Sequence, residues 1–413
     1  MITNIISAIG NNRSVYPLIL RDCGIEVPSK IYITRKENLK ESKTKANDAT
    51  REKFIDEYAT SAIWLGGIPL VEKIYDKFIK SKGFNPTADI KLFREEAYQG
   101  INYNIRKFKN LASEEIKELE KLKNNRRIVE KLTAGKFAAA TLIPIAVMGF
   151  ALPKLNFALT KRIKDKRKNN IRNRINQPSM TAFTSGKNIS FGGNWVSAVA
   201  NLKTVDKMAI TDGGLTVGRV STSRNKDEAY MNAFRMIGSM ILNFVTPVYI
   251  AKFLDKCANK TFGLNVNLDP LIMGDKNLIQ AIKENNIELP KSSEAQDLFE
   301  FIDSKPKSLF SQMASKQGKI FYLENGIRDP RKYVNIKDLG NFRNEFESFI
   351  KSAQNSSDIT KFVKKAKFVK GFNILSNVLI SSALLAIALP KLQYKFNKLI
   401  TGSYSDPGLR EQL

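Results

Sequence analysis

The chain has 413 residues, of which 43% are hydrophobic, so it can bury a sizeable core and wholesale disorder is not expected. Its formal net charge of +27 indicates an anionic partner or surface, such as anionic lipid, nucleic acid or an acidic protein. Histidine is absent and only Cys23 and Cys257 occur, which excludes histidine-based catalysis, a disulfide framework and a zinc cluster of several cysteines. We therefore expect a protein that is not an enzyme and that has no cofactor and no metal site.

The first feature along the chain is a block of 24 residues at 4–27 that returns at 194–217. Eight positions are identical when the two blocks are compared without gaps, whereas unrelated sequences would share about one or two. Two further pairs of similar blocks follow in the same order, 68–85 with 246–265 and 149–161 with 386–398. Ordered similarity of this kind predicts an internal duplication.

The two copies of the first block share an Asp-x-Gly pattern, formed by Asp22 with Gly24 and by Asp212 with Gly214. Aspartate can accept backbone N–H hydrogen bonds and glycine can take a positive φ, so the pattern predicts a tight turn in each copy. An alternative interpretation is a pair of symmetry-related binding loops.

The duplication predicts the domain organisation. We expect a first repeat at 1–160, a polybasic inter-repeat linker at 161–190 and a second repeat at 191–413. The spacing between the second and third blocks is longer in the second repeat, which indicates an inserted helical region around 266–335.

Four windows contain no charged residue and are predominantly apolar: 58–71, 137–153, 236–251 and 371–390. Each has a proline near its C-terminal end, and these prolines are Pro69, Pro153, Pro247 and Pro390. Proline removes a backbone hydrogen bond and kinks or ends a helix. The windows therefore predict four Pro-terminated apolar helices, two in each repeat.

The windows fit a membrane location better than any other single location, with the cytoplasm as the alternative. A spanning helix needs about 20 apolar residues, which 371–390 supplies and 137–153 nearly supplies. If all four windows crossed the membrane, one side would carry 30 lysine and arginine residues and the other side 37. This difference is too small to predict which side faces the cytoplasm. Re-entrant helices, or apolar helices buried in a soluble core, agree equally well with these lengths.

The segments between the windows read as charged amphipathic helices, so the predicted fold is mainly α with few or no strands. Only 29–36 and 215–223 resemble strands, and loops fit them as well. The second of these overlaps "GGLTVGRV" at 213–220, which lacks the lysine and the Ser or Thr of a phosphate-binding loop because Arg219 and Val220 stand there.

The linker carries the densest positive charge in the chain. A run of basic residues next to an apolar helix favours anionic lipid, although a solvated linker and an RNA-binding segment are alternatives. The candidate anion-binding residues are Lys161, Arg162, Lys164, Lys166, Arg167, Lys168, Arg172 and Arg174.

Together these features predict a non-enzymatic, membrane-associated helical protein, scaffold-like or pore-like, whose basic flanks face anionic lipid. The alternative is a soluble all-α module that binds an acidic protein or nucleic acid. The sequence does not indicate the oligomeric state.

Overall fold

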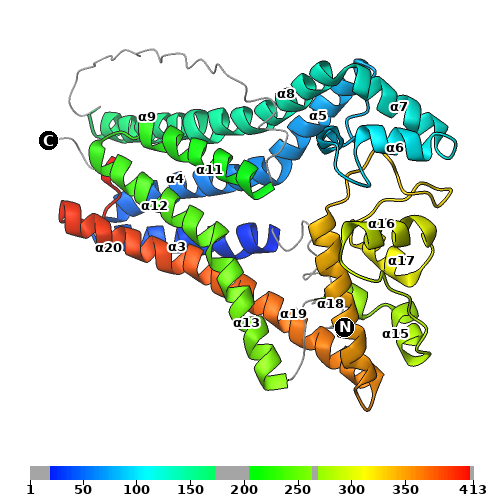
Figure 1. The fold of residues 1–413 in the computed structure, drawn as a ribbon. Helices are drawn as coiled ribbons and strands as arrows, with labels where there is room; N and C mark the ends of the chain where they lie inside the picture. Colours follow the sequence, from blue (N-terminus) through cyan, green and yellow to red (C-terminus); the bar gives the residue numbers. More distant parts are fainter. Residues whose placement is uncertain (1–18, 173–203, 263–267, 410–413) are drawn as a thin grey trace. The chain divides into compact units, whose positions relative to one another are not determined.

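The computed structural model describes residues 19–172, 204–262 and 268–409 (Figure 1). The fold is mainly α, as predicted, and within these residues there is no strand beyond two isolated bridges. The segments that resembled strands are helical, because 29–36 lies in α3 (Val27–Leu39) and 215–223 lies almost entirely in α11 (Thr204–Ser221). Their β-branched residues have only a weak preference for strands, which the packing of helices readily overrides.

The chain divides into two compact units, each of which is discontinuous in sequence. Unit 1 contains Tyr75–Thr133 and Thr246–Ile380, and unit 2 contains Ile19–Ile74, Ala134–Val245 and Ser381–Leu413. Each unit draws segments from both predicted repeats. The boundaries of the predicted repeats therefore differ from the boundaries of the compact units. The repeats stay a prediction about how the sequence arose by duplication.

Unit 1 is built around two apolar clusters, and the larger of them takes most of its residues from the region predicted as an insertion. A buried guanidinium, that of Arg328, lies 4.8 Å from the ring centre of Phe299 in one cluster and 5.1 Å from that of Phe108 in the other. The elements of unit 1 are η3 (Ile90–Arg94), α6 (Ile101–Phe108), α7 (Ser113–Asn124), α13 (Thr246–Phe262), α14 (Pro270–Met273), α15 (Lys276–Lys283), α16 (Ala295–Ser304), α17 (Leu309–Lys316) and α18 (Ile336–Gln354).

Unit 2 is a bundle of longer helices. Its elements are η1 (Leu20–Glu26), α3, α4 (Lys43–Ala62), η2 (Ile63–Gly67), η4 (Ile145–Ala151), α9 (Leu152–Arg172), α11, α12 (Lys226–Phe244), η5 (Leu384–Ala388), α20 (Leu389–Thr401) and η6 (Pro407–Leu409). Three more helices begin in one unit and end in the other, α5 (Ile68–Ser81), α8 (Arg126–Pro144) and α19 (Ile359–Ala383).

The four prolines of the apolar windows do not end their helices, which corrects the prediction of Pro-terminated helices. Helical structure continues beyond Pro69, Pro153, Pro247 and Pro390. Three of the four, all but Pro247, follow a π-helical turn, in η2, η4 or η5. In each of these turns, the N–H of the residue before the proline donates to the carbonyl five residues earlier. The wider turn relieves the clash between the proline ring and the preceding turn, so the helix can continue.

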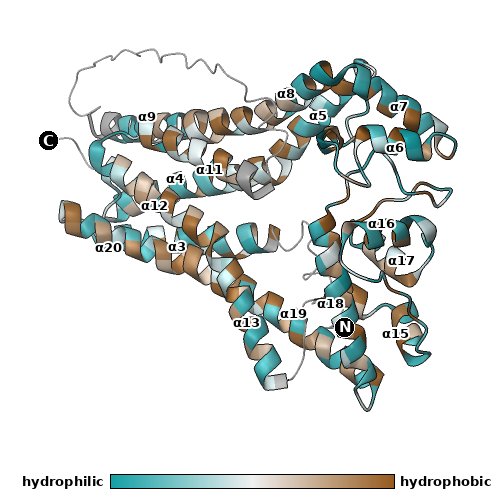
Figure 2. Ribbon diagram, viewed as in Figure 1, coloured by the Kyte–Doolittle hydropathy of each residue, from teal (hydrophilic) through white to brown (hydrophobic). Residues whose placement is uncertain are grey.

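Among the described residues, three continuous helical runs are long and apolar enough to cross a membrane: Arg126–Arg167, Lys226–Thr261 and Ile359–Thr401. They contain the predicted windows 137–153, 236–251 and 371–390 as apolar stretches, and Figure 2 shows apolar residues along them. The window at 58–71 is not among these runs, because its helix is charged on both sides of a short apolar stretch.

The predicted turns at the Asp-x-Gly pattern are wrong. Asp22 and Gly24 lie in the π-helical η1, and Asp212 and Gly214 lie inside α11. Neither glycine has a positive φ. In α11 the glycine serves packing instead, because a Cβ at Gly214 would overlap the side chain of Ile145 in η4.

One turn later, α11 approaches η4 even more closely. A Cβ on Gly218 would lie 2.9 Å from the Cα of Gly149, a separation that real Cβ atoms do not adopt. The hydroxyl of Thr222 also donates to the carbonyl of Gly149 at 3.4 Å. Gly214 and Gly218 thus form a small-xxx-small pattern that lets two helix backbones touch, as is common between membrane helices.

Candidate functional site: a buried ion-pair network in unit 2

The most distinctive chemistry in unit 2 is a row of carboxylates on α4. The helix begins at Ser42, whose hydroxyl accepts the N–H of Thr44. Asp48, Glu52 and Asp56 follow at four-residue spacing, which places them on one face of the helix. All three side chains are largely buried, so each needs a positively charged partner.

Each carboxylate of this row meets an arginine from another part of unit 2. Arg167 of α9 lies 3.0 Å from Asp48, and Arg219 of α11 lies 2.6 Å from Asp56. Arg219 also donates to the hydroxyl of Thr60 at 2.9 Å. The row therefore ties α4 to helices more than 100 residues away in sequence.

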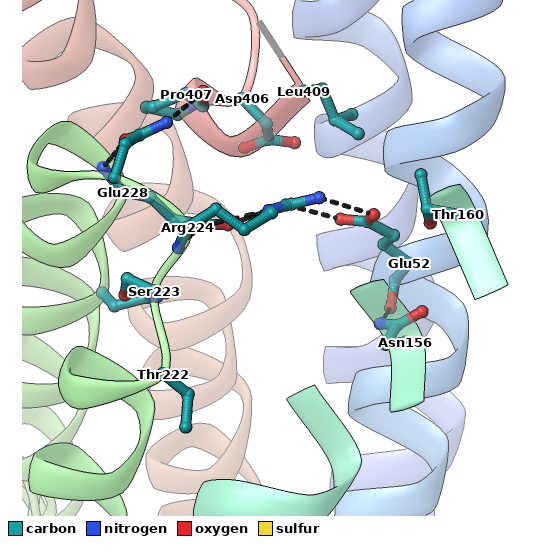
Figure 3. Close-up of polar contacts among 12 residues, drawn as sticks. Glu52, Asn156, Thr160, Thr222, Ser223, Arg224, Glu228, Asp406, Pro407 and Leu409 are labelled. Atoms are coloured by element: carbon teal, nitrogen blue, oxygen red, sulfur yellow. Dashed lines mark hydrogen bonds and ion pairs between the residues drawn. The ribbon is translucent and has the colours of Figure 1, made fainter. Parts of the chain in front are cut away.

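Arg224, in the loop between α11 and α12, holds the middle of the row (Figure 3). Its two terminal nitrogens donate to the two carboxylate oxygens of Glu52, both at 3.0 Å, while Glu228 accepts from the other side at 2.7 Å. The guanidinium also lies 4.1 Å from the ring centre of Phe157. Burial alone would lower the pKa of Arg224, but the hydrogen bond of Glu228 and the charge of Glu52 raise it, so the guanidinium stays charged.

A second set of ion pairs extends the row toward η1 and α3. Glu57 accepts from Lys53 at 2.8 Å and from Lys30 at 3.3 Å. Arg235 of α12 lies 3.6 Å from Asp56 and 4.0 Å from Glu57. Although burial would raise the pKa of Glu57, the surrounding charges, Lys30 and Lys53 foremost, hold it well below its ordinary value.

Two cavities border this network. One, of about 160 Å³, lies among η1, α4, α11, α12 and η5. The other, of about 100 Å³, is lined by α4, α9, α12 and α20 together with the loop that carries Arg224. Arg219 and Arg235 line both cavities. Most of the charges are engaged in ion pairs, so the arrangement suits binding and positioning better than covalent chemistry.

Asp212 is the exception to this pairing. It lines the larger cavity, and within the described part of the chain its carboxylate has no ion pair or hydrogen bond. Burial raises the pKa of Asp212 to about 6, well above the ordinary value of 3.8. An acid with a raised folded-state pKa favours the fold fully below its ordinary pKa, and that stabilisation is lost as the pH rises through about 6.

We therefore expect Asp212→Asn to stabilise the protein by about 1 to 2 kcal/mol at pH 7.5, because it removes a half-buried charge that has no partner among the described residues. The gain should shrink as the pH falls from about 6 toward 4, because Asp212 is then protonated in the folded state and increasingly also in the unfolded state. Thermal unfolding of both proteins in detergent from pH 4 to 8 measures this. Asp22→Asn is the control, because Asp22 pairs with Arg21 at 3.0 Å and its removal should bring no gain; a pH-independent effect of Asp212→Asn would contradict the prediction.

The basic residues predicted to bind anions begin on α9, which runs through Lys161, Arg162, Lys164, Lys166, Arg167, Lys168 and Arg172. Arg174 lies outside the described residues. Arg167 is engaged by Asp48, and Lys164 donates to the carbonyl of Leu409 at 3.2 Å. Lys161, Arg162 and Lys166 are exposed.

Sequence reasoning missed the network itself. The four-residue spacing of Asp48, Glu52 and Asp56 was a visible signal, but solvated helices carry the same spacing. In the sequence, Arg219 stands out only as a departure from a phosphate-binding loop. In the residues that the structure describes, no group of three or more Cys, Asp or Glu side chains is arranged to hold a metal ion.

The network cannot be interpreted through a relative. No family model matches the chain, and neither a curated protein nor a solved structure matches it. Its function therefore has to be inferred from the helices, the charges and the cavities themselves.

Proposed function

We propose that this chain is a non-enzymatic integral membrane protein, scaffold-like or pore-like, held in the bilayer by its three long apolar helical runs. The observation that carries the proposal is the exposure of their apolar side chains. In Lys226–Thr261, no residue of the most apolar 18-residue window is buried. A monomer in water would not leave such a surface uncovered, whereas lipid covers it at no cost.

The exposed apolar residues of α12 form one stripe. Ile237, Ile241 and Val245 recur at four-residue intervals, which places them on one face while Arg235 points to the ion-pair network. On α13, Val248, Tyr249 and Phe253 are exposed as well. The run has 36 residues, more than the roughly 20 that a spanning helix needs.

Basic residues follow the apolar part of α9, as the proposal requires. Lys161, Arg162 and Lys166 are exposed two to four helical turns after the apolar window, where anionic headgroups would attract them by about 1 kcal/mol each. Anionic lipid is therefore the proposed partner.

The pairing of helices in unit 2 supports the proposed duplication. α4 packs on α9 as α12 packs on α20, and each of these pairs lies within one predicted repeat. Across the repeats, α11 packs on η4, as η1 and the following α3 pack on η5. In both repeats, the N-terminal helical segment thus packs on the π-helical segment of the other repeat. This pattern is expected of two copies related by an approximate two-fold axis.

The smaller cavity supports the same relation. Residues separated by 237 positions, the offset between the third pair of similar blocks, line it together. These pairs are Pro153 with Pro390, Asn156 with Gln393, and Phe157 with Tyr394.

Fractionation of cells that express the full chain tests the proposal. We expect the protein to sediment with membranes, to resist washing with high salt and alkaline carbonate, and to be released by detergent. Recovery in the soluble fraction at low salt without detergent would contradict it. Release by high salt alone would favour the alternative, a soluble module held to an acidic partner by charge.

A pair of variants sharpens this test. Ile237→Lys with Ile241→Lys puts two charges on the exposed stripe, each of which costs about 2.5 to 3.5 kcal/mol at the centre of a bilayer. We expect the carbonate-resistant fraction to fall several-fold. Gln312→Lys, on an exposed position of α17, adds a lysine away from the stripe and should leave the fraction unchanged.

A further inference from the structure

We propose that α13 and α19 present a docking surface for the headgroups of anionic phospholipid, formed by exposed lysines that border exposed aromatic rings. The inference rests on the proposed function and deepens it, because it places headgroup binding on two particular helices. The residues that carry it are α13 and the part of α19 at 359–380, and both belong to unit 1.

Along α19 the exposed side chains form one face. Four of them follow one another at intervals of four, three and four residues, which places them on the same side of the helix. They are Lys361, Lys365, Phe368 and Phe372, and the exposed Lys364 borders the two lysines. The two rings are each more than half exposed, and they stack on each other with their centres 6.5 Å apart.

This face points away from the interior of unit 1. On the opposite side of α19, Val363, Ala366 and Val369 are buried in the larger apolar cluster. Two turns beyond Phe372, the exposed face continues with Leu379. The face therefore changes along the helix from lysines to aromatic rings and then to aliphatic side chains.

The exposed face of α13 shows the same change in the reverse direction along the chain. Tyr249 and Phe253 are each about two-thirds exposed. Lys252, Lys256 and Lys260 follow at four-residue intervals and are exposed as well. The ammonium of Lys252 lies 6.0 Å from the ring centre of Tyr249, so lysine and aromatic ring adjoin on this helix too.

Hydrogen bonds show how the two helices are oriented. Asp255 of α13 accepts from Lys370 at 3.3 Å and from Asn373 at 3.0 Å. Earlier in α13, the carbonyl of Pro247 accepts from Asn377 at 3.1 Å. The contacts run in opposite directions along the two helices, so the helices are antiparallel. The last lysines of α13 and the first lysines of α19 therefore lie at the same end of the pair.

The charge at this end is one-sided. The helical run Ile359–Thr401 contains no aspartate or glutamate, and the single acidic residue of α13, Asp255, is already engaged. Asp358, directly before α19, lies 3.6 Å from Lys361 and offsets one positive charge. An end of this kind attracts anions. The lysines that make no ion pair within the described part of the chain are Lys256, Lys260 and Lys364.

The order of side chains points to lipid among the anionic partners. Lysine stems reach the headgroups, aromatic rings lie at the interface and aliphatic side chains contact the hydrocarbon. Lys365 and Phe368 are about 4.5 Å apart along the helix axis, which fits a headgroup layer about 5 to 7 Å thick. A nucleic acid bound to the lysines would leave the adjoining apolar surface around Leu379 uncovered.

Quenching of a tryptophan at the surface tests the proposal. The full chain with Phe368→Trp is reconstituted in vesicles of four parts phosphatidylcholine to one part phosphatidylglycerol. Bromine is carried by the phosphatidylglycerol in one sample and by the same amount of phosphatidylcholine in another. We expect brominated phosphatidylglycerol to quench more, with a local enrichment of about fivefold. The parent protein gives the background from Trp64 and Trp195.

Two triple variants in the Phe368→Trp background assign the preference to the lysines. Lys361→Gln with Lys364→Gln and Lys365→Gln should bring the quenching ratio of the two lipids close to one. The matched control removes the same charge from exposed lysines at the end of α6 and on α7, which carries four glutamates. This control, Lys109→Gln with Lys117→Gln and Lys123→Gln, should leave the ratio unchanged.

A second probe separates this inference from the proposed function. Ile237→Trp lies on the exposed stripe of α12, where contact with hydrocarbon does not depend on the headgroup. We expect both brominated lipids to quench it equally. If they do so while Phe368→Trp shows no preference, the membrane location stands and the headgroup surface is wrong. If neither tryptophan is quenched, both proposals are wrong.

Two further outcomes would overturn the inference. One is a preference for phosphatidylglycerol that survives the three glutamine substitutions on α19 or disappears in the control variant. The other is a saturable change in the emission of Phe368→Trp when polyuridylate is added in detergent without lipid. If the glutamine variant abolished that change, the surface would bind nucleic acid instead.

Discussion

Replacing Arg219 by alanine should lower the free energy of unfolding by about 3 to 5 kcal/mol, the effect typical of breaking a buried ion pair from one side. Arg219 is 7% exposed and donates to Asp56 at 2.6 Å and to Thr60 at 2.9 Å. Without it, the ion pair left to Asp56 among the described residues would be the longer one with Arg235, at 3.6 Å. Thermal and denaturant unfolding of the purified chain in detergent measure the loss.

The matched control is an exposed pair. Arg126→Ala breaks the ion pair with Glu130, which lies four residues away on α8 with Arg126 57% exposed, and should cost less than about 0.5 kcal/mol. Leucine at both Arg219 and Asp56 should recover part of the stability that Arg219→Ala loses, because Asp56 is then no longer an unpaired buried charge and Arg235 keeps Glu57 at 4.0 Å. A loss below about 1 kcal/mol for Arg219→Ala would mean that the network does not hold unit 2 together.

The same network should make the protein sensitive to acid. The pKa of Glu57 lies well below its ordinary value, with Lys30 and Lys53 as the main favourable charges. A carboxylate with a lowered pKa stabilises the fold above its ordinary pKa, and this contribution is lost as the pH falls toward the lowered value.

Gly218→Ala should destabilise the protein by about 2 to 4 kcal/mol, although alanine is the better helix former. The added Cβ would lie 2.9 Å from the Cα of Gly149 and 3.0 Å from its carbonyl carbon and oxygen, and backbone cannot rotate away as a side chain can. Helices α11 and η4 would have to separate, and overpacking of this kind costs about 1 to 3 kcal/mol or more. The melting temperature in detergent reports the change.

Gly213→Ala is the control on the same helix. Among the described residues, no atom from another element lies within 4 Å of its added Cβ, so the helix preference of alanine decides. We expect a gain of about 0.5 to 1 kcal/mol. Equal effects of the two substitutions would show that the contact between Gly218 and Gly149 does not decide the stability of unit 2.

The sequence predicted the helical content and three of the apolar runs because these are local properties. Hydrophobic windows such as 137–153 and 371–390 predict apolar helices from the local sequence alone, and the structure has long apolar helices there. The window at 58–71 is predicted as a fourth apolar helix, but it is not among the candidate spans, because charged residues flank its short apolar stretch.

The predictions from single prolines and glycines were wrong, because each of these residues occurs in more than one kind of structure. Pro153 predicts a helix end, but the π-helical turn before it accommodates the ring and α9 continues. Gly214 predicts a turn, but it stands in a helix because Ile145 of η4 needs the space of a Cβ. In each case a neighbouring turn or helix decides, and the residue type alone does not.

By itself, the sequence determined a basic, mainly α-helical chain with long apolar helices and no histidine chemistry. Only the tertiary structure decided which charges meet. Asp56 and Arg219 lie 163 residues apart, and nothing in either local pattern distinguishes a buried partner from a solvated one. Ion pairs and cavities depend on which helices pack together, so the pairing of Asp56 and the isolation of Asp212 emerge only when distant segments share one interior.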